Sequence, residues 1–282
     1  MKQIIILLIF LGLICVEMTA QQVIINSEME FYQQRFKMRV KQIDEFRKRF
    51  NYEQDIEGYP IEDTVNLEMR KRYILSLFNE NLFDHILPDS VLKLYNDFIN
   101  TVANKENPIY LDFTDNNWLA STNSKVMLNG KPEEITVFLQ PEKIREYEYK
   151  WVIIGAKGSI LTLSPVQKNP EKIMISPVDN EIKFMSLANI SAKSNNDIIN
   201  YSFSGYTPDN LTVFNTLIYT GQLKILYTQK LSYYYFQVPE YIFRVEQFEH
   251  QTDNTGWLIA EIIKIEDKDK NGFLNKLLND KD

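Results

Sequence analysis

"VMLNGKPEEITVFL", residues 126–139, contains a strong indication of a β-hairpin. Asn129-Gly130 lies between an apolar run that ends at Leu128 and a second apolar run over residues 135–139. Both turn residues tolerate the positive φ angles that a two-residue hairpin turn requires. The stretch therefore predicts two adjacent antiparallel strands.

Helical patterns precede this hairpin. Ser27 and Glu30 form a capping-box pair, and apolar residues then recur every three or four positions as far as Phe50, which is the period of a helix. From Pro108 the period changes to two, as in a half-buried strand. The elements predicted before the hairpin are helices near 27–50, near 65–83 and from Pro88-Asp89 onward, and a strand over 109–113.

A second set of elements follows the hairpin. Residues 155–158 contain two glycines and predict a turn between two strands. Thr207, Pro208 and Gly221 have the residue types of a helix N-cap, first helical position and C-terminal stop. The predicted elements are strands at 147–154 and 160–163, a short helix at 180–190, a helix over 207–221, and strands near 224–238, 241–248 and 257–265.

This order of helices followed by antiparallel strands predicts an α+β fold, with N-terminal helices packed on an antiparallel sheet. The division expected along the chain is a signal peptide at 1–20, an α+β unit at 23–164, a second α+β unit at 176–266 and a charged tail at 267–282. The order of elements is similar to the nuclear transport factor-like and cystatin-like folds, two units of which would account for the chain. This resemblance implies a fold only, since such folds host unrelated functions.

The N-terminal residues predict export. A short basic start precedes an apolar run from Ile4 to Val16, which has the length of a secretory signal and is too short to span a bilayer. Cleavage after Ala20 is expected, and it places the protein in the periplasm or outside the cell. Lipid anchoring at Cys15 is an alternative, although Ile14 is larger than the residue that normally precedes a lipidated cysteine. Because Cys15 is the only cysteine, a mature chain from Gln21 has no disulfide and no thiolate chemistry.

The formal net charge of −7 argues against nucleic-acid binding, in which contacts to phosphate dominate the affinity. No second long apolar run is present, so no transmembrane helix is expected. The first predicted helix has a basic face, which suits peripheral contact with an anionic membrane. Asp44 and Glu45 interrupt this face, so a solvated face with local ion pairs is the favoured interpretation.

Two routes to catalysis remain in the sequence. Asp84-His85 could form a base with an orienting neighbour, and Asp112 could pair with another carboxylate in a hydrolase-like cleft. No nucleophile elbow, phosphate-binding loop or dinucleotide fingerprint is present. A carboxylate-dependent hydrolase is therefore an alternative to a protein without catalytic residues.

The tail resembles the first half of a calcium-binding loop. Asp267, Asp269 and Asn271 occupy the first, third and fifth positions. The twelfth position should hold a bidentate carboxylate, and here it is Leu278. We therefore expect no calcium site, no other metal site and no cofactor.

A tyrosine-rich strand is the remaining candidate for a binding site. Alternation along residues 233–236 places Tyr233 and Tyr235 on one face of a strand, where stacked rings could hold a sugar or an extended peptide. Burial of the rings in a sheet core is the other interpretation. The sequence as a whole favours an exported binding, accessory or assembly protein of the cell envelope, whose partner is an envelope protein, a peptide or a glycan.

Overall fold

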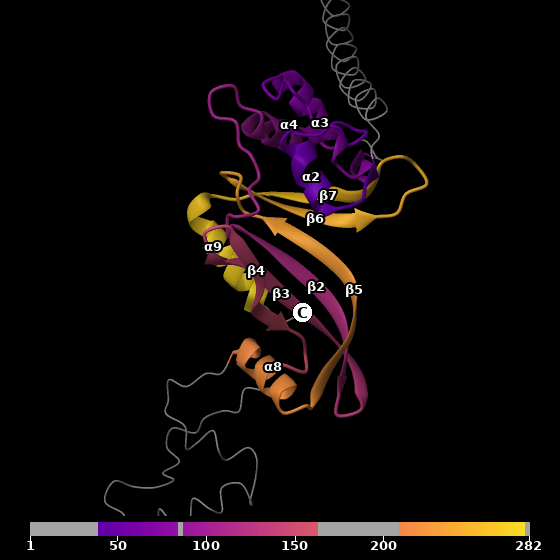
Figure 1. The fold of residues 1–282 in the computed structure, drawn as a ribbon, viewed down its shortest axis with the longest axis vertical. Coiled ribbons are helices and arrows are strands. Elements are labelled where there is room, and N and C mark those ends of the chain that lie inside the picture. The colour runs from indigo at the N-terminus through magenta and orange to yellow at the C-terminus, as the bar shows by residue number, and fades with distance from the viewer. Residues whose placement is uncertain (1–38, 84–86, 163–208, 280–282) are drawn as a thin grey trace, which may run out of the picture. The chain divides into compact units, whose positions relative to one another are not determined.

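The computed structural model describes residues 39–83, 87–162 and 209–279, and it has an α+β fold (Figure 1). Helices pack with a sheet whose strand order is β1-β7-β6-β5-β2-β3-β4. Six of its strands form the antiparallel sheet, and the two-residue β1 pairs parallel with β7. The predicted fold class is therefore confirmed. The likeness to the nuclear transport factor-like and cystatin-like folds stays a prediction.

The chain divides into two compact units. Unit 1 comprises Met1–Ser121, Gln140–Val152 and Leu231–Phe273, and unit 2 comprises Thr122–Leu139, Ile153–Lys230 and Leu274–Asp282. Each unit thus combines three separate segments of the chain, whereas the units expected from the sequence are consecutive.

Unit 1 has its helices against β6 and β7 (Figure 1). Its core is aromatic: Phe243 of β6 lies 4.8 Å from Tyr235, 5.6 Å from Phe50 and 5.5 Å from Phe98 between ring centroids. The elements that lie wholly in this unit are β1 (Arg39–Val40), α2 (Ile43–Phe50), α3 (Leu67–Ser76), η1 (Glu80–Phe83), α4 (Asp89–Val102), β6 (Tyr241–Phe248), β7 (Thr255–Lys264) and η3 (Asp267–Asp269).

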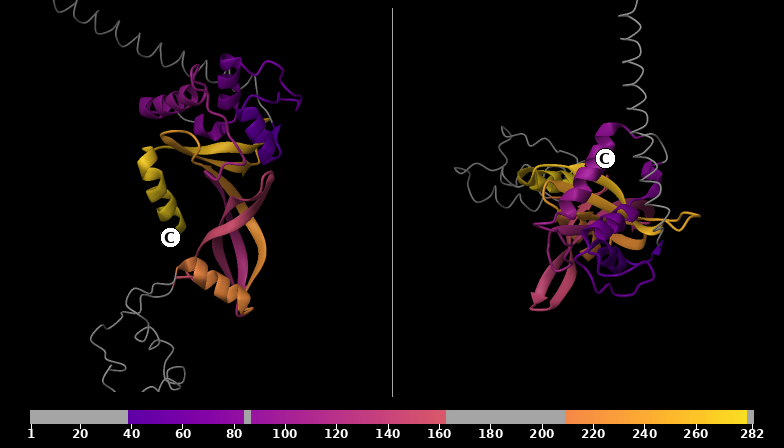
Figure 2. Two further views of the ribbon diagram at one scale, coloured as in Figure 1. Left: turned by 60° about the vertical axis from the view of Figure 1, so that its left-hand side comes forward. Right: turned by 90° about the horizontal axis from the view of Figure 1, so that it is seen from above.

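Unit 2 has a smaller aliphatic core in which Phe214 of α8 packs with Val126 and Ile135 of the hairpin strands. Figure 2 shows α8 at the end of these strands, and Asn129 N–H donates to the Gln222 carbonyl over 2.9 Å. Of the described helices, α8 (Asn210–Tyr219) lies wholly in this unit. The elements with residues in both units are β2 (Trp118–Leu128), β3 (Lys131–Arg145), β4 (Glu148–Lys157), β5 (Leu223–Tyr235) and α9 (Lys270–Asn279).

Short-range signals account for the elements that agree with the sequence. The hairpin turns at Asn129 (φ 47°) and Gly130 (φ 83°), as its residues predict. The helix expected over 207–221 is α8, and its N-cap is Asp209, whose carboxylate accepts from Thr212 N–H over 2.7 Å. The strands predicted near 224–238, 241–248 and 257–265 are β5, β6 and β7.

Four predicted elements differ from the structure: the helix near 65–83 is shorter than expected, and the strand at 109–113, the turn at 155–158 and the strand at 160–163 are not found as predicted. The helix expected near 65–83 ends at Ser76, because Leu77 C=O accepts from Ile259 N–H over 2.7 Å in β7. No strand forms at 109–113, where Leu111 pairs instead with the side chain of Asn51. Residues 155–157, predicted as a turn, belong to β4. Residues 160–162 are not in a strand, and residue 163 lies outside the described range.

Several predicted features lie outside the described residues. These are the signal segment with Cys15, the start of the first predicted helix, the pair Asp84-His85, the helix expected at 180–190, and Thr207-Pro208. In the described ranges, no helix has both the length and the apolar character needed to cross a membrane.

Candidate functional site

Tyr233 and Tyr235 share one face of β5, as predicted, and that face is buried. Tyr235 has no exposed surface, and its ring stacks on those of Trp118 and Phe243. Tyr233 is 9% exposed and lies against Trp257 with 5.1 Å between centroids. Neither ring therefore presents a face on which a sugar or peptide could stack, and both tyrosines belong to the core of unit 1.

The hydroxyl of Tyr235 gives a test of this placement. It is buried, and it has no hydrogen-bond partner among the described residues, so burial raises the pKa of Tyr235 well above its ordinary value. Because an unpaired buried hydroxyl costs free energy, Tyr235→Phe is expected to leave the free energy of unfolding unchanged or to raise it by about 1 kcal/mol. Equilibrium urea denaturation measures the change. A loss of stability would contradict the placement.

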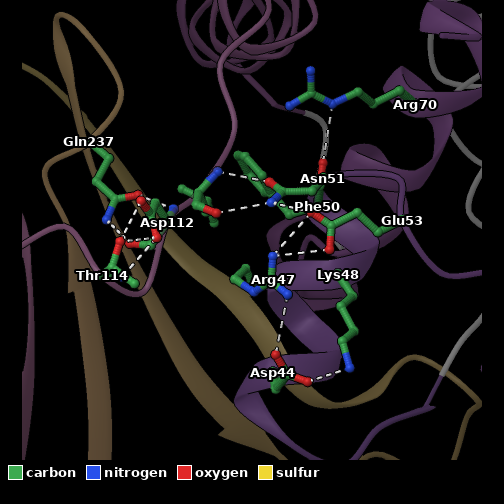
Figure 3. A network of polar contacts seen from close by, with 11 residues as sticks. Asp44, Arg47, Lys48, Phe50, Asn51, Glu53, Arg70, Asp112, Thr114 and Gln237 are labelled. Carbon is green, nitrogen blue, oxygen red and sulfur yellow. Dashed lines mark hydrogen bonds and ion pairs between the residues drawn. The ribbon is translucent and has the colours of Figure 1, made fainter. Parts of the chain in front are cut away.

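Asp112 has a structural role in the loop that follows α4 (Figure 3). Its carboxylate accepts from Thr114 N–H over 2.8 Å and from the Thr114 hydroxyl. Its backbone N–H and C=O bond the side-chain amide of Gln237. The Asp112 carboxylate therefore stabilises a turn. The other catalytic candidates, Asp84 and His85, lie outside the described residues.

The basic face of the first helix is paired locally where the structure describes it (Figure 3). Arg47 lies 3.4 Å from Asp44 and 3.0 Å from Glu53, and Lys48 lies 2.6 Å from Asp44. Arg49, another basic residue of the same helix, is 4% exposed. Membrane contact through this face stays a prediction.

The tail residues start a helix. Asp267 and Asp269 lie in η3, and Asn271 lies in the first turn of α9. The Asp267 carboxylate lies 2.8 Å from Lys270 Nζ and accepts from Glu240 N–H over 3.0 Å. These hydrogen bonds lower the pKa of Asp267 below its ordinary value of 3.8. No group of three or more potential metal-ligating side chains occurs in the part of the chain that the structure describes.

We therefore expect that Asp267 does not bind calcium and that its contribution to stability depends on pH. Isothermal titration at micromolar calcium is expected to give no binding heat, and a clear isotherm abolished by Asp267→Ala would contradict this. The pKa of Asp267 is lower in the folded protein than in the unfolded chain. The contribution of the Asp267–Lys270 pair to the free energy of unfolding is therefore fully present above pH 3.8 and is lost as the pH falls through the folded pKa. Asp267→Ala should destabilise by less than about 1 kcal/mol at neutral pH, since the Asp267 side chain is 59% exposed, and Asp269→Ala is the control.

One segment of β5 is unusually exposed for a strand within a sheet. Residues 224–230, here called the exposed β5 segment, are all solvent-exposed. Ile225 and Leu226 are each 43% exposed and Tyr227 is 58% exposed. Alternation places Ile225 and Tyr227 on one face and Leu226 on the other. Both faces of the segment therefore present apolar side chains to solvent.

Within residues 39–83, 87–162 and 209–279, one backbone edge of the exposed β5 segment has no neighbouring strand. β5 lies between β6 and β2 in the sheet, but β6 pairs with residues 232–235 of β5 only. On the other side, Ser124 Oγ of β2 lies 3.2 Å from Thr228 Oγ1. Among the described residues, the segment thus pairs along one edge, and the backbone groups of its second edge have no neighbouring strand.

The exposed β5 segment is not among the sites predicted from the sequence, which include the tyrosines at the other end of the same strand. The available signal was the run Ile225-Leu226-Tyr227 between Lys224 and Lys230. Such a run has no polar alternation, so it fits either a strand buried on both faces or an exposed binding strand. Sequence periodicity does not distinguish these two cases.

Comparisons of the chain with protein-family models, with curated proteins and with solved structures find no match.

Proposed function

We propose that the protein is a non-catalytic binding protein of the cell envelope, and that it binds an extended polypeptide segment of a partner protein along the exposed β5 segment. The observation that supports the proposal is that three consecutive exposed apolar side chains lie on a strand edge without a neighbour in the described part of the chain. An incoming strand would satisfy the open backbone groups and cover the apolar side chains, as in β-strand addition.

The side chains of the segment suggest the chemistry of the partner. Lys224 and Lys230 flank the apolar residues, and opposite charges on directly paired residues stabilise neighbouring strands. A matching segment would therefore have apolar residues at its centre and an acidic residue near the end that lies opposite Lys224. Lysines on an edge strand also discourage unspecific pairing.

The same lysines disfavour a second copy of this chain as the partner. In an antiparallel pair centred on Tyr227, Lys224 of each copy would lie opposite Lys230 of the other. Like charges directly opposite each other destabilise a strand pair. A different protein with acidic residues fits the segment better.

The experiment uses the full chain in its native envelope with a photo-crosslinking amino acid in place of Tyr227. We expect a defined crosslinked partner, which is then purified. In its presence, backbone amides of residues 224–230 should become protected from hydrogen exchange. Ile225→Lys should weaken the affinity at least about tenfold, which corresponds to about 1.4 kcal/mol, because it places a charge in the apolar centre.

Tyr219→Lys is the matched control. Tyr219 is 92% exposed and lies at the end of α8, so it offers the same surface chemistry without a strand edge. Equal affinity of wild type and Ile225→Lys for the crosslinked partner would contradict the proposal. A crosslink to a second copy of the chain would replace the proposed partner with a homodimer.

Export is part of this proposal and has its own test. Mass spectrometry of the mature protein is expected to find an N-terminus at Gln21. A diacylglyceryl-modified Cys15 at the N-terminus would instead identify a lipid-anchored envelope subunit.

A further inference from the structure

Unit 1 contains a cleft of about 370 Å³ beside the N-terminal end of α2. Its charged lining consists of three basic and three acidic side chains, and Ile56 contributes an apolar one. A cleft of this volume lies in the range of small-molecule binding sites. The charged residues that line it are Arg39, Lys41, Arg49, Glu45, Glu57 and Asp253.

Arg49 is the unusual member of this lining. It is 4% exposed, and it donates from Nη1 to the Arg39 carbonyl over 2.7 Å and from Nη2 to the Ile56 carbonyl over 3.4 Å. Its Nε–H is buried and has no partner among the described residues. Burial lowers the pKa of the guanidinium, which nevertheless stays protonated at neutral pH. The cleft thus has a buried positive charge and one buried donor, Nε–H, that no described residue satisfies.

Three carboxylates near this site make contacts with other groups, although the charges of Glu45 and Asp55 partly offset the lowering of the Arg49 pKa by burial. Glu45 Oε2 accepts from the Lys41 backbone N–H over 2.8 Å. Asp55 accepts from the Glu57 and Tyr59 N–H groups, and Asp253 lies 3.5 Å from Arg39. No described carboxylate is ion-paired with Arg49. Because a buried charge is costly without an ionic partner, a carboxylate supplied by a ligand would complete the site, and guanidinium binds carboxylates with two parallel hydrogen bonds.

We propose that this cleft binds a small zwitterion, specifically a free amino acid, with its carboxylate on Arg49. The balance of three basic and three acidic lining residues favours a ligand without net charge over a dianion. Glu57 lines the cleft and is exposed, so it is available to the ammonium group of the ligand. Ile56 provides an apolar contact for a side chain.

The test is isothermal titration of the full chain with each of the twenty free L-amino acids at millimolar concentration. We expect at least one to bind. Its methyl ester, which lacks the carboxylate charge, and its N-acetyl derivative, which lacks the ammonium charge, should each bind at least about tenfold more weakly. Absence of binding by all twenty amino acids, or equal binding of the ester, would overturn the proposal.

Two variants and a control test which residues bind the amino acid. Arg49→Lys keeps the charge and loses the planar pair of donors, and it is expected to weaken binding at least about tenfold. Glu57 is exposed, so Glu57→Gln tests the binding of the ammonium group without disturbing the core. If Arg49→Lys fails to fold, the affinity of Glu57→Gln tests the proposed site. Lys48→Gln is the control on the same helix, because Lys48 does not line the cleft. Unchanged affinity in Glu57→Gln and in a folded Arg49→Lys would overturn the assignment.

Discussion

Phe243→Ala is expected to lower the free energy of unfolding by about 3–5 kcal/mol, the range measured when a buried aromatic side chain is truncated in a core. Phe243 has no exposed surface. Its ring contacts those of Phe46, Phe50, Phe98 and Tyr235, so truncation leaves a cavity where α2, α4, β5 and β6 meet. The loss should be large here because the neighbouring rings come from three other elements, α2, α4 and β5, and cannot all move into the gap.

Equilibrium urea denaturation followed by tryptophan fluorescence measures this change. Tyr219→Ala is the control, since Tyr219 is 92% exposed and its removal should change stability by less than about 0.5 kcal/mol. A loss below about 1 kcal/mol for Phe243→Ala would contradict a closely packed aromatic core.

Asn51→Asp is expected to cost about 2–4 kcal/mol, because it replaces a donor with a charged acceptor at a buried backbone contact. Asn51 is 2% exposed. Its Nδ2 donates to the Leu111 carbonyl over 2.9 Å, and its Oδ1 accepts from Leu111 N–H over 2.8 Å (Figure 3). An aspartate can still accept from Leu111 N–H. It leaves the Leu111 carbonyl unpaired and facing a carboxylate.

Asn104→Asp is the matched control for this change. Asn104 is exposed, and its Oδ1 accepts hydrogen bonds from the N–H groups of Glu106 and Asn107. An aspartate can make both bonds, so the free energy of unfolding should change by less than about 0.5 kcal/mol. Equal urea midpoints for Asn51→Asp and wild type would show that the amide does not hold the 109–113 loop.

Arg70 reinforces the same connection and explains why residues 109–113 do not form a strand. Its side chain has no exposed surface. It donates to the carbonyls of Phe50 and Ile109, and it lies over the Tyr110 ring, 4.2 Å from the centroid. Two side chains, Asn51 and Arg70, thus satisfy backbone groups that a neighbouring strand would satisfy in a sheet. Alternation of apolar residues in this loop reflects one buried residue, Leu111, next to exposed ones.

The two proposed binding sites differ in how far the sequence indicates them. The exposed β5 segment is visible in the sequence as a strand, but its lack of a covering layer is not. The cleft of Arg49 is not visible at all, because its lining comes from residues 39–58 and from Asp253. A helical wheel places Arg49 among solvated basic residues. The turn over residues 55–59 and the β1 backbone instead enclose its guanidinium.

The sequence by itself determined the features that depend on neighbouring residues. The Asn129-Gly130 turn, the periods of α2, α4 and β5, and the α+β class all follow from local backbone preferences and side-chain spacing. Tertiary structure alone decided which faces are covered. Periodicity states which side chains share a face, but whether that face meets solvent depends on segments far away in the chain. For this reason Tyr235 is buried beneath Phe46 and Trp118, whereas Tyr227, eight residues earlier on the same strand, remains open to a partner.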